Sequence, residues 1–496
     1  MNTTRAKDFT QWYQEVVDIA DLAENSTVRG CMVIKPWGMG TWERVQRLLD
    51  DKIKETGHDN CYFPLFVPVS LFLKEAAHVE GFAKEMALVT HTRLKIVDGQ
   101  VKLEGQLEEP LVVRPTSETI IAESFAQWIH SYRDLPVLVN QWANVVRWEM
   151  RPRLFLRTTE FLWQEGHTAH ADAAEAEAEA AKMLEVYRAL MEDHLALPVI
   201  TGEKTPQERF PGAVATYSLE AFLQDGKALQ AGTSHYLGQD FAKAAKIQFQ
   251  DKDGQLHYVH TTSWGVSTRL IGAVIMTHGD DDGLRLPPAI APSQIVIVPI
   301  HREEGDKAPV TAFCEQLAAR LRAQVFQGEP LRVKVDVRDR KAQDKRWEWV
   351  KKGAPLVVEV GPRDLAKGEV CWISRLEIGK KNFEAADAFV AGAGERLQAM
   401  QAALLAQAKA FRDANIRTDI KDFAAFKGYF SKKAAYLAEG APGWVRAHWC
   451  GDEDSLKVLD EMAVTIRNIP SDQKGPGVCV LTGKPAEKEV YFARAY

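Results

Sequence analysis

A proline-rich stretch at residues 285–292 divides this sequence into two parts with different hydrophobic patterns. Its three prolines disfavour a helix and produce a stiff connection. Before the stretch, amphipathic helices mix with short aromatic and β-branched segments. After it, apolar strands alternate with helices, which is typical of a small α/β domain with a mainly parallel sheet. Because 496 residues are enough for about three domains, we predict a multi-domain α/β protein.

The first part contains segments whose spacing predicts particular elements. Residues 39–56 fit an amphipathic helix that ends at Gly57, and residues 172–195 fit a long helix with Asp172 as its N-cap. Residues 61–68 fit a strand interrupted by prolines, which suits a sheet edge or an interface. Residues 137–165 predict two antiparallel strands around a loop at 150–153.

The second part predicts a regular alternation followed by a less regular end. Strands are expected at 294–299, 331–337 and 355–361, with helices at 309–326 and 341–353. Residues 395–414 are rich in strong helix formers and predict one long helix. We expect the residues after 440 to be irregular.

Composition and charge narrow the class of protein. Hydrophobic residues make up 46% of the chain and charged residues 26%, as in ordinary globular proteins. The net charge of −6 gives no overall basic field, although a local basic face could still bind nucleic acid. The N-terminus lacks the apolar core of a secretory signal, and no apolar run of about 20 residues predicts a membrane span. Six scattered cysteines are typical of a reducing compartment, so we expect a cytoplasmic protein.

Two segments combine arginine with groups that suit a nucleotide. Arg147 and Glu149 are two residues apart, so on a strand both would face the same side. Residues 263–269 predict the start of an apolar helix, a position that favours anions, with Arg269 in its first turns. Each pattern alone is more often an ordinary ion pair or helix cap. Together, two arginines could hold the phosphates of a bent nucleotide, and Phe161 or a neighbour could stack on its base.

Longer motifs in the chain resemble those of prolyl-tRNA synthetases of the archaeal/eukaryotic-like type, which are class II aminoacyl-tRNA synthetases. They are LVVRPTSE at 111–118, RTTEFLWQEGH at 157–167, AGTSHYLG at 231–238 and THGDD at 277–281. The segments at 57–68, around Arg147 and at 263–269 resemble motifs 1, 2 and 3 of class II enzymes. The resemblance implies an antiparallel-sheet catalytic core with helices at 1–287, an α/β anticodon-binding domain at 288–395 and a small α+β C-terminal domain at 396–496.

The resemblance also implies a reaction. ATP with Mg²⁺ would convert L-proline to prolyl-adenylate with release of pyrophosphate, and the prolyl group would then pass to the 3′ end of tRNA(Pro). Arg147 and Arg269 would be the catalytic residues. The implied proline-binding residues are Thr116, Glu118, Arg147 and His235. The implied ATP-binding residues are Arg147, Glu149, Thr158, Gln230, Thr233, Ser267 and Arg269.

The second part carries a basic segment that could contact tRNA. Residues 340–352 hold six basic and two acidic residues, with Trp347 and Trp349 between them. Such a segment can bind phosphates and stack on unpaired bases, or it can be a solvated helix with two core tryptophans. Candidate tRNA contacts from the family resemblance and this segment are Arg363, Asp364, Lys351 and Lys352.

Metal binding by the protein itself is not expected. Relatives of this kind often bind structural zinc through four cysteines, whereas this sequence keeps Cys450 and Cys479, one from each pair, and zinc prefers four ligands. The sequence does not identify Mg²⁺ ligands, and Asp280 and Asp281 fit better as braces at a helix end.

The family resemblance implies a homodimer, and we expect neither a membrane nor a DNA partner. We also expect no large editing insertion in the roughly 120 residues between Arg147 and Arg269. Two other functions stay open at this stage. One is a synthetase-like regulator or tRNA-binding module without catalysis, and the other is a related ligase for threonine, glycine or histidine.

Overall fold

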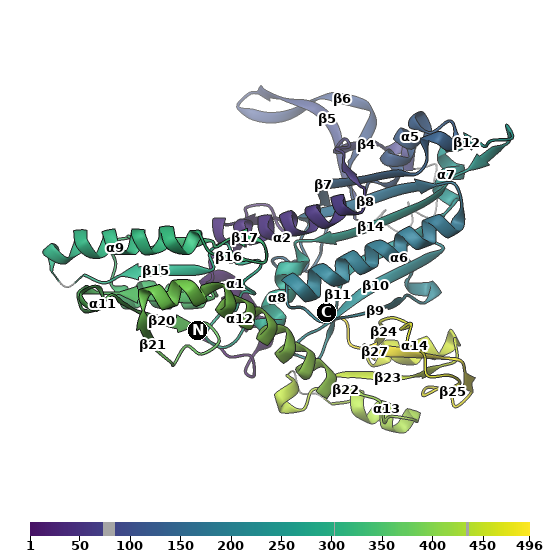
Figure 1. Ribbon diagram of the computed structural model, residues 1–496. Coiled ribbons are helices and arrows are strands. Elements are labelled where there is room, and N and C mark those ends of the chain that lie inside the picture. The colour runs from purple at the N-terminus through teal and green to yellow at the C-terminus, as the bar shows by residue number, and fades with distance from the viewer. Residues whose placement is uncertain (73–84, 302, 433–435) are drawn as a thin grey trace.

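The computed structural model describes residues 1–72, 85–301, 303–432 and 436–496. Figure 1 shows three packed parts, each built around its own sheet, and a long β-hairpin that projects from the first. We call them the seven-stranded unit, the five-stranded unit and the C-terminal unit. The predicted combination of antiparallel core, α/β unit and small α+β unit is confirmed.

The seven-stranded unit is built on an almost entirely antiparallel sheet. Its strand order is β3-β7-β8-β14-β11-β10-β9, and only the short β3 pairs in parallel with its neighbour. The strands are β3 Asp59–Asn60, β7 Val137–Val146, β8 Glu160–His170, β14 His260–Ser267, β11 Ala228–Gly238, β10 Ala215–Phe222 and β9 Val199–Glu203.

Helices cover this sheet and bury its aromatic side chains. They are α1 Phe9–Ile19, α2 Pro36–Glu55, α5 Glu118–Trp128, α6 Ala173–Ala189, α7 Asp240–Ala245 and α8 Arg269–His278. Helix α6 packs on β11 and β14, where Trp264 is buried beside Tyr187. The predicted N-cap is confirmed, since the Asp172 carboxylate accepts a hydrogen bond from the Glu175 amide at 2.9 Å.

Residues 61–68, predicted as a strand interrupted by prolines, include the strand β4 (Phe66–Pro68) at a sheet edge, and the short β3 just before them is also an edge strand. Strand β3 is at one edge of the large sheet, and β4 is at an edge of a three-stranded sheet with β6 (Gln100–Val113) and β5 (Ala87–Val97). An edge strand tolerates proline because its outer side pairs with no other strand, so the missing backbone N–H leaves no hydrogen bond of the sheet unmade.

Two local predictions near the site were wrong. Strand β7 ends at Val146, so Arg147 and Glu149 lie in the following loop and the strand-face argument does not apply to them. Residues 263–267 belong to strand β14, and the helix begins only at Arg269. The buried Trp264 and Val266 recur with the two-residue period of a strand, and β14 pairs with β8 and β11 on its two sides.

The five-stranded unit follows the proline-rich connection. Its strand order is β18-β15-β19-β20-β21, with two parallel and two antiparallel pairings, so the predicted mainly parallel sheet is instead evenly mixed. The strands are β18 Val333–Val335, β15 Ile295–Pro299, β19 Leu356–Val360, β20 Glu369–Ser374 and β21 Asn382–Ala385. The helices are α9 Glu304–Arg322, α10 Ala342–Lys351 and α11 Pro362–Lys367.

Helix α12 (Ala386–Ala414) leads from the five-stranded unit into the C-terminal unit, and the boundary expected at 395/396 falls inside it (Figure 1). The end of the chain is more regular than predicted. Strands β22 Ile416–Arg417, β23 Trp444–Trp449, β27 Lys488–Ala493 and β24 Thr465–Ile466 form one sheet, with helices α13 Phe423–Phe430 and α14 Asp454–Glu461. The strands of this sheet are short and pair with strands distant in the sequence, as β23 does with β27, so local periodicity does not predict them.

A buried charge cluster attaches the C-terminal unit to the large sheet. The Glu220 carboxylate, fully buried on β10, accepts hydrogen bonds from Lys204 Nζ at 2.9 Å and Arg467 Nη2 at 2.8 Å. Burial alone would raise the pKa of Glu220, but the charges of Arg467 and Lys204 outweigh it and lower the pKa. The three groups therefore depend on one another for charge compensation.

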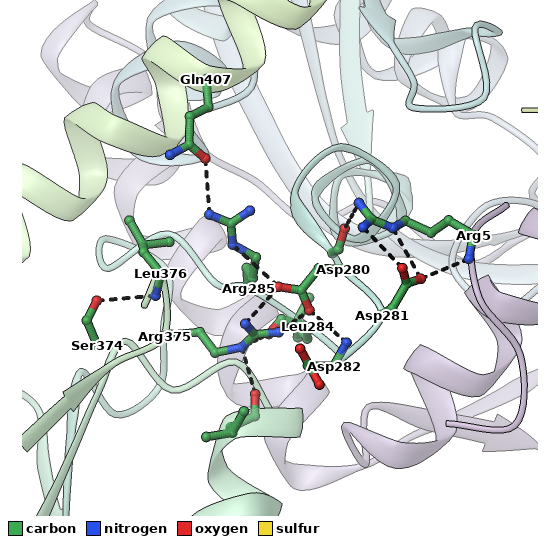
Figure 2. A network of polar contacts seen from close by, with 12 residues as sticks. Arg5, Asp280, Asp281, Asp282, Leu284, Arg285, Ser374, Arg375, Leu376 and Gln407 are labelled. Carbon is green, nitrogen blue, oxygen red and sulfur yellow. Dashed lines mark hydrogen bonds and ion pairs between the residues drawn. The ribbon is translucent and has the colours of Figure 1, made fainter. Parts of the chain in front are cut away.

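Acidic residues after α8 form two ion pairs, and that of Asp280 joins the seven-stranded unit to the five-stranded unit (Figure 2). Asp280 binds Arg375 of the five-stranded unit, and Asp281 binds Arg5 near the N-terminus. This confirms the prediction that Asp280 and Asp281 brace the helix end. In the parts of the chain that the structure describes, no helix has both the length and the apolar character needed to cross a membrane.

Candidate active site

Two cavities meet on one face of the seven-stranded sheet. The sheet cavity is lined mainly by β8, β11 and β14, and the loop cavity by the chain after β7 and before β8. Four residues line both cavities: Arg147, Phe161, Ser267 and Arg269. The two arginines predicted from sequence therefore stand at the junction between two compartments.

Strand alternation directs side chains into the sheet cavity. Every second residue along a strand points to the same face, so each central strand contributes a row of lining groups. The rows are Phe161, Trp163, Glu165 and His167 on β8, Thr233 and His235 on β11, and Ser263, Gly265 and Ser267 on β14.

Carboxylates gather at one end of the sheet cavity. The Thr116 hydroxyl donates to Glu118, the first residue of α5, and the Ser117 hydroxyl donates to Glu165. Glu165 also accepts from Gln141 Nε2 at 2.7 Å and lies 2.9 Å from His167 Nε2. These hydrogen bonds hold the two buried carboxylates in place. Their negative charge makes this end of the cavity suited to a cation such as an ammonium group.

The two histidines of the sheet cavity have opposite pKa shifts. Burial, opposed by the charge of Glu118, lowers the pKa of His235 to about 4, so this ring is neutral at pH 7. Burial would also lower the pKa of His167, but its hydrogen bond to Glu165 and the charge of that carboxylate raise it overall. His235 packs against Phe210, with ring centroids 4.7 Å apart and the rings tilted by 33°, and forms an uncharged wall of the cavity.

The arginines make the junction of the cavities suited to anions. The Arg147 guanidinium lies over the Phe161 and Trp163 rings at 5.7 and 5.4 Å, and its Nε donates to the Pro115 carbonyl at 2.8 Å. Arg269 donates to the Leu156 and Gln230 carbonyls. Burial and the charges of Arg157 and Arg147 lower the pKa of Arg269 to about 10, so it stays protonated at neutral pH. A bound anion would relieve the repulsion among these cations.

Buried polar atoms mark places where a ligand could bind. Among the described residues, Thr158 Oγ1 in the loop cavity and Trp163 Nε1 and Ser263 Oγ of sheet-cavity residues are buried without a hydrogen-bond partner. Buried polar groups are usually satisfied by protein, water or ligand. These three atoms therefore could bond a molecule that occupies the two cavities.

The last residue described, Tyr496, contacts the loop that follows β7. Its hydroxyl accepts a hydrogen bond from Arg153, whose guanidinium lies 5.2 Å from the centre of the Tyr496 ring. The Lys227 ammonium lies 5.6 Å from the same ring, and the Tyr496 amide donates to the Ala228 carbonyl at 3.0 Å. The C-terminal unit thereby supports both the loop and the start of β11.

Three family models match successive parts of this chain. The tRNA synthetase class II core domain (G, H, P, S and T) matches residues 101–278, which include every lining residue of the sheet cavity and all those of the loop cavity except Glu85. The anticodon binding domain matches residues 294–387, and the prolyl-tRNA synthetase C-terminal model matches residues 434–496.

Full-length similarity to curated proteins decides the family. The chain is 59% identical over 497 aligned positions to a proline–tRNA ligase of Paramagnetospirillum magneticum, covering 99% of this chain and 98% of the relative. It is 56% identical to one of Protochlamydia amoebophila and 53% identical to one of Bdellovibrio bacteriovorus, each with 99% of this chain and 98% of the relative covered. The chain belongs to the proline–tRNA ligase family.

The structure brings together all the residues predicted to bind proline or ATP. Eight of these residues line the sheet cavity, and Glu149 and Thr158 line the loop cavity beside Arg147 and Arg269. The eight are Thr116, Glu118, Arg147, Gln230, Thr233, His235, Ser267 and Arg269. Sequence reasoning missed Glu165 and His167 as lining residues. The alternation of Phe161, Trp163, Glu165 and His167 in the quoted motif was a signal that could have found them.

The candidate tRNA contacts occupy different settings. Arg363 is exposed on α11, whereas Asp364 accepts a hydrogen bond from the Gly361 amide at the start of that helix. The Lys352 ammonium lies 3.3 Å from Asp21 and from Glu348, so Lys352 stands at the junction between units. Lys351, the last residue of α10, is half-buried.

Of the two tryptophans in the basic segment, Trp349 is a core residue. It is only 3% exposed, and its Nε1 donates to Asp336 at 2.8 Å. Trp347 is 38% exposed and is the one that could reach a base.

The two cysteines of the C-terminal unit occupy different environments. Cys450 Sγ lies 3.4 Å from the Thr482 hydroxyl. Cys479 is buried. Within residues 1–72, 85–301, 303–432 and 436–496, no three His, Cys, Asp or Glu side chains are grouped so that they could hold a metal ion.

Proposed function

We propose that this chain uses ATP to convert L-proline to prolyl-adenylate, with release of pyrophosphate, and then transfers the prolyl group to the 3′ end of tRNA(Pro). One observation carries the proposal: an acidic compartment and a second compartment lined by Thr158 and Glu149 join at Arg147 and Arg269. Two substrates held on either side of that junction would meet at the arginines.

The first step needs positioning and charge compensation rather than a nucleophilic side chain. An oxygen of the proline carboxylate bonds to the α-phosphorus while the bond from that phosphorus to the pyrophosphate oxygen breaks. Arg147 would bind both the attacking carboxylate and the α-phosphate, and Arg269 would bind a phosphate. Such preorganised cations stabilise the charge that develops in the transition state. In the second step, a terminal ribose hydroxyl of the tRNA attacks the activated carbonyl and AMP leaves.

The acidic end of the sheet cavity would select proline. Thr116 and Glu118 would bind its secondary ammonium, whose positive charge is complementary to the Glu118 carboxylate. A neutral His235 would not repel that ammonium, and Phe210 and Trp163 give the cavity aromatic walls. On the nucleotide side, Glu149 and Thr158 would contact adenine, and Gln230, Thr233 and Ser267 would make further ATP contacts.

Mg²⁺ would enter with ATP, bound to its phosphates. Mg²⁺ in such sites keeps several waters and uses only one or two protein carboxylates. Besides Glu149, which is assigned to adenine, the described lining of the loop cavity holds one further carboxylate, Glu85, which could provide such a ligand.

We further propose the archaeal/eukaryotic-like type, a cytoplasmic location and a homodimer. The motifs quoted from the sequence support the type. Between β8 and β14, the chain adds β9, β10 and β11 to the same sheet, which agrees with a design that lacks a separate editing insertion at this point. Strands β3 and β4, within residues 59–68, lie at sheet edges, where a second copy could pack. Arg363 and the exposed Trp347 are the preferred tRNA contacts in the five-stranded unit.

ATP–pyrophosphate exchange measured with each of the twenty amino acids tests this proposal. We expect exchange with proline above all others, without any need for tRNA, and charging of a tRNA(Pro) transcript. Exchange with threonine, glycine or histidine in preference to proline would replace the substrate assignment. No exchange with any amino acid, together with retained tRNA binding, would favour a non-catalytic tRNA-binding protein.

A further inference from the structure

Helix α8 connects the junction of the cavities to the five-stranded unit. Its first residue is Arg269, and Asp280 follows two residues after its last residue, His278. Ten helical residues span about 15 Å. Eight of the ten are buried, so the helix is clamped by the core along its length. The core therefore holds Arg269 in place when the contacts of Asp280 change, and whatever binds Asp280 is held at a fixed position relative to Arg269.

Arg375 holds the Asp280 end from the other unit (Figure 2). Its side chain is only 2% exposed, and both terminal nitrogens donate to the Asp280 carboxylate, at 2.8 and 2.5 Å. Its Nε donates to the carbonyls of Leu284 and Val350, at 2.8 and 2.9 Å. One guanidinium thus joins the end of α8, the connection between the units and the end of α10. This fork geometry fixes orientation as well as distance.

A neighbouring ion pair provides an internal comparison. Asp281 binds Arg5, with Nε to Oδ1 at 3.3 Å, but both residues belong to the seven-stranded unit. The Asp281 side chain is 42% exposed, whereas that of Asp280 is 23% exposed. The two aspartates are adjacent in sequence and differ in which unit they bind.

We propose that the Asp280–Arg375 pair positions the five-stranded unit relative to the active site, and that it accelerates transfer of proline to tRNA but does not contribute to proline activation. The inference rests on the proposed function. Activation uses proline and ATP, which both bind in the seven-stranded unit. Transfer also requires a tRNA that spans both units to place its 3′ end at the cavities, and an error of about 1 Å in placement can cost on the order of 100-fold in rate.

Asp280→Asn and Asp281→Asn form the matched test. For Asp280→Asn, we expect ATP–pyrophosphate exchange within about twofold of wild type, while kcat/KM for charging a tRNA(Pro) transcript falls about tenfold, inside the usual range of coupling between sites. For Asp281→Asn, both activities should stay within about twofold, because an exposed ion pair contributes little. Equal charging by the two variants, or an equal loss of exchange and charging in Asp280→Asn, overturns the inference.

A second variant covers the case in which Asp280→Asn does not fold. Arg375→Lys keeps the positive charge but loses the fork, and it should show the same separation of exchange from charging. In the double variant Asp280→Asn/Arg375→Lys, charging should be no slower than in the more affected single variant, because either substitution alone already breaks the same contact. Additive losses, or normal charging by Arg375→Lys, contradict a shared positioning role. A wild-type chain without proline-dependent exchange would instead refute the proposed function.

Discussion

Replacement of Arg147 by alanine tests the central physical claim about the site. The Arg147 guanidinium is fixed by the Pro115 carbonyl and by two aromatic rings at the junction of the cavities. A charged donor preorganised in this way is comparable to an oxyanion-hole donor, whose removal costs about 2.7–4 kcal/mol of transition-state stabilisation, or roughly 10²–10³ in kcat. We therefore expect at least this loss of proline-dependent ATP–pyrophosphate exchange in Arg147→Ala.

The kinetic pattern separates a role in the transition state from a role in folding. Because Arg147 would bind both the attacking carboxylate and the α-phosphate, kcat should fall by more than KM for either substrate rises. Arg147→Lys keeps the charge but not the planar fork, and it should recover only part of the activity. Arg151→Ala changes an exposed arginine of the same loop and is the control, with exchange close to wild type. Exchange by Arg147→Ala within tenfold of wild type would refute this reasoning.

Three further predictions concern the surroundings of the site. Tyr496→Phe keeps the ring that contacts Arg153 and Lys227 but removes the hydroxyl that accepts from Arg153. The loss of this hydrogen bond, about 1 kcal/mol, should raise KM for ATP roughly fivefold. An unchanged KM would show that the hydroxyl does not position the loop between β7 and β8. The raised pKa of His167 means that its charge stabilises the fold fully below the unfolded pKa of about 6.5, and that this stability is lost as pH rises through the folded pKa. The free energy of unfolding should therefore fall more in His167→Gln at pH 6 than at pH 9, and equal losses would contradict the pairing with Glu165. Glu220→Gln leaves Lys204 and Arg467 buried without a counter-charge, so urea unfolding should show a loss of about 3–5 kcal/mol, whereas a loss under 1 kcal/mol would mean that the cluster is solvated.

Local sequence patterns predicted much of the fold but failed where strand and helix signals compete. The strand–loop–strand segment at 137–165 and the cap at Asp172 follow from side chains within a few residues of each other, and both were confirmed. The segment 263–267 was assigned to a helix because an apolar run follows it. Its strand is stabilised by β8 and β11, about 100 and 30 residues away in the sequence, and local periodicity does not include those partners.

The candidate site shows the same division. The family motifs indicated ten of the residues that line the two cavities, because chemistry restricts which side chains can occupy those positions. They did not indicate that the cavities share a wall at Arg147 and Arg269. Nor did they show that Lys352 binds Asp21 and Glu348 at the junction between units, or that Trp349 is buried.

The sequence by itself determined the chemical groups available to this protein, the order of its units and the positions of several long helices and some of the strands. These depend on residue types, on short-range periodicity and on motifs that can be compared without a structure. Only the tertiary structure decided which charges face each other: His167 with Glu165, Glu220 with two cations, and Asp280 with Arg375. Most of these pairs join residues distant in the chain, and their strength and pKa values depend on burial that only packing creates.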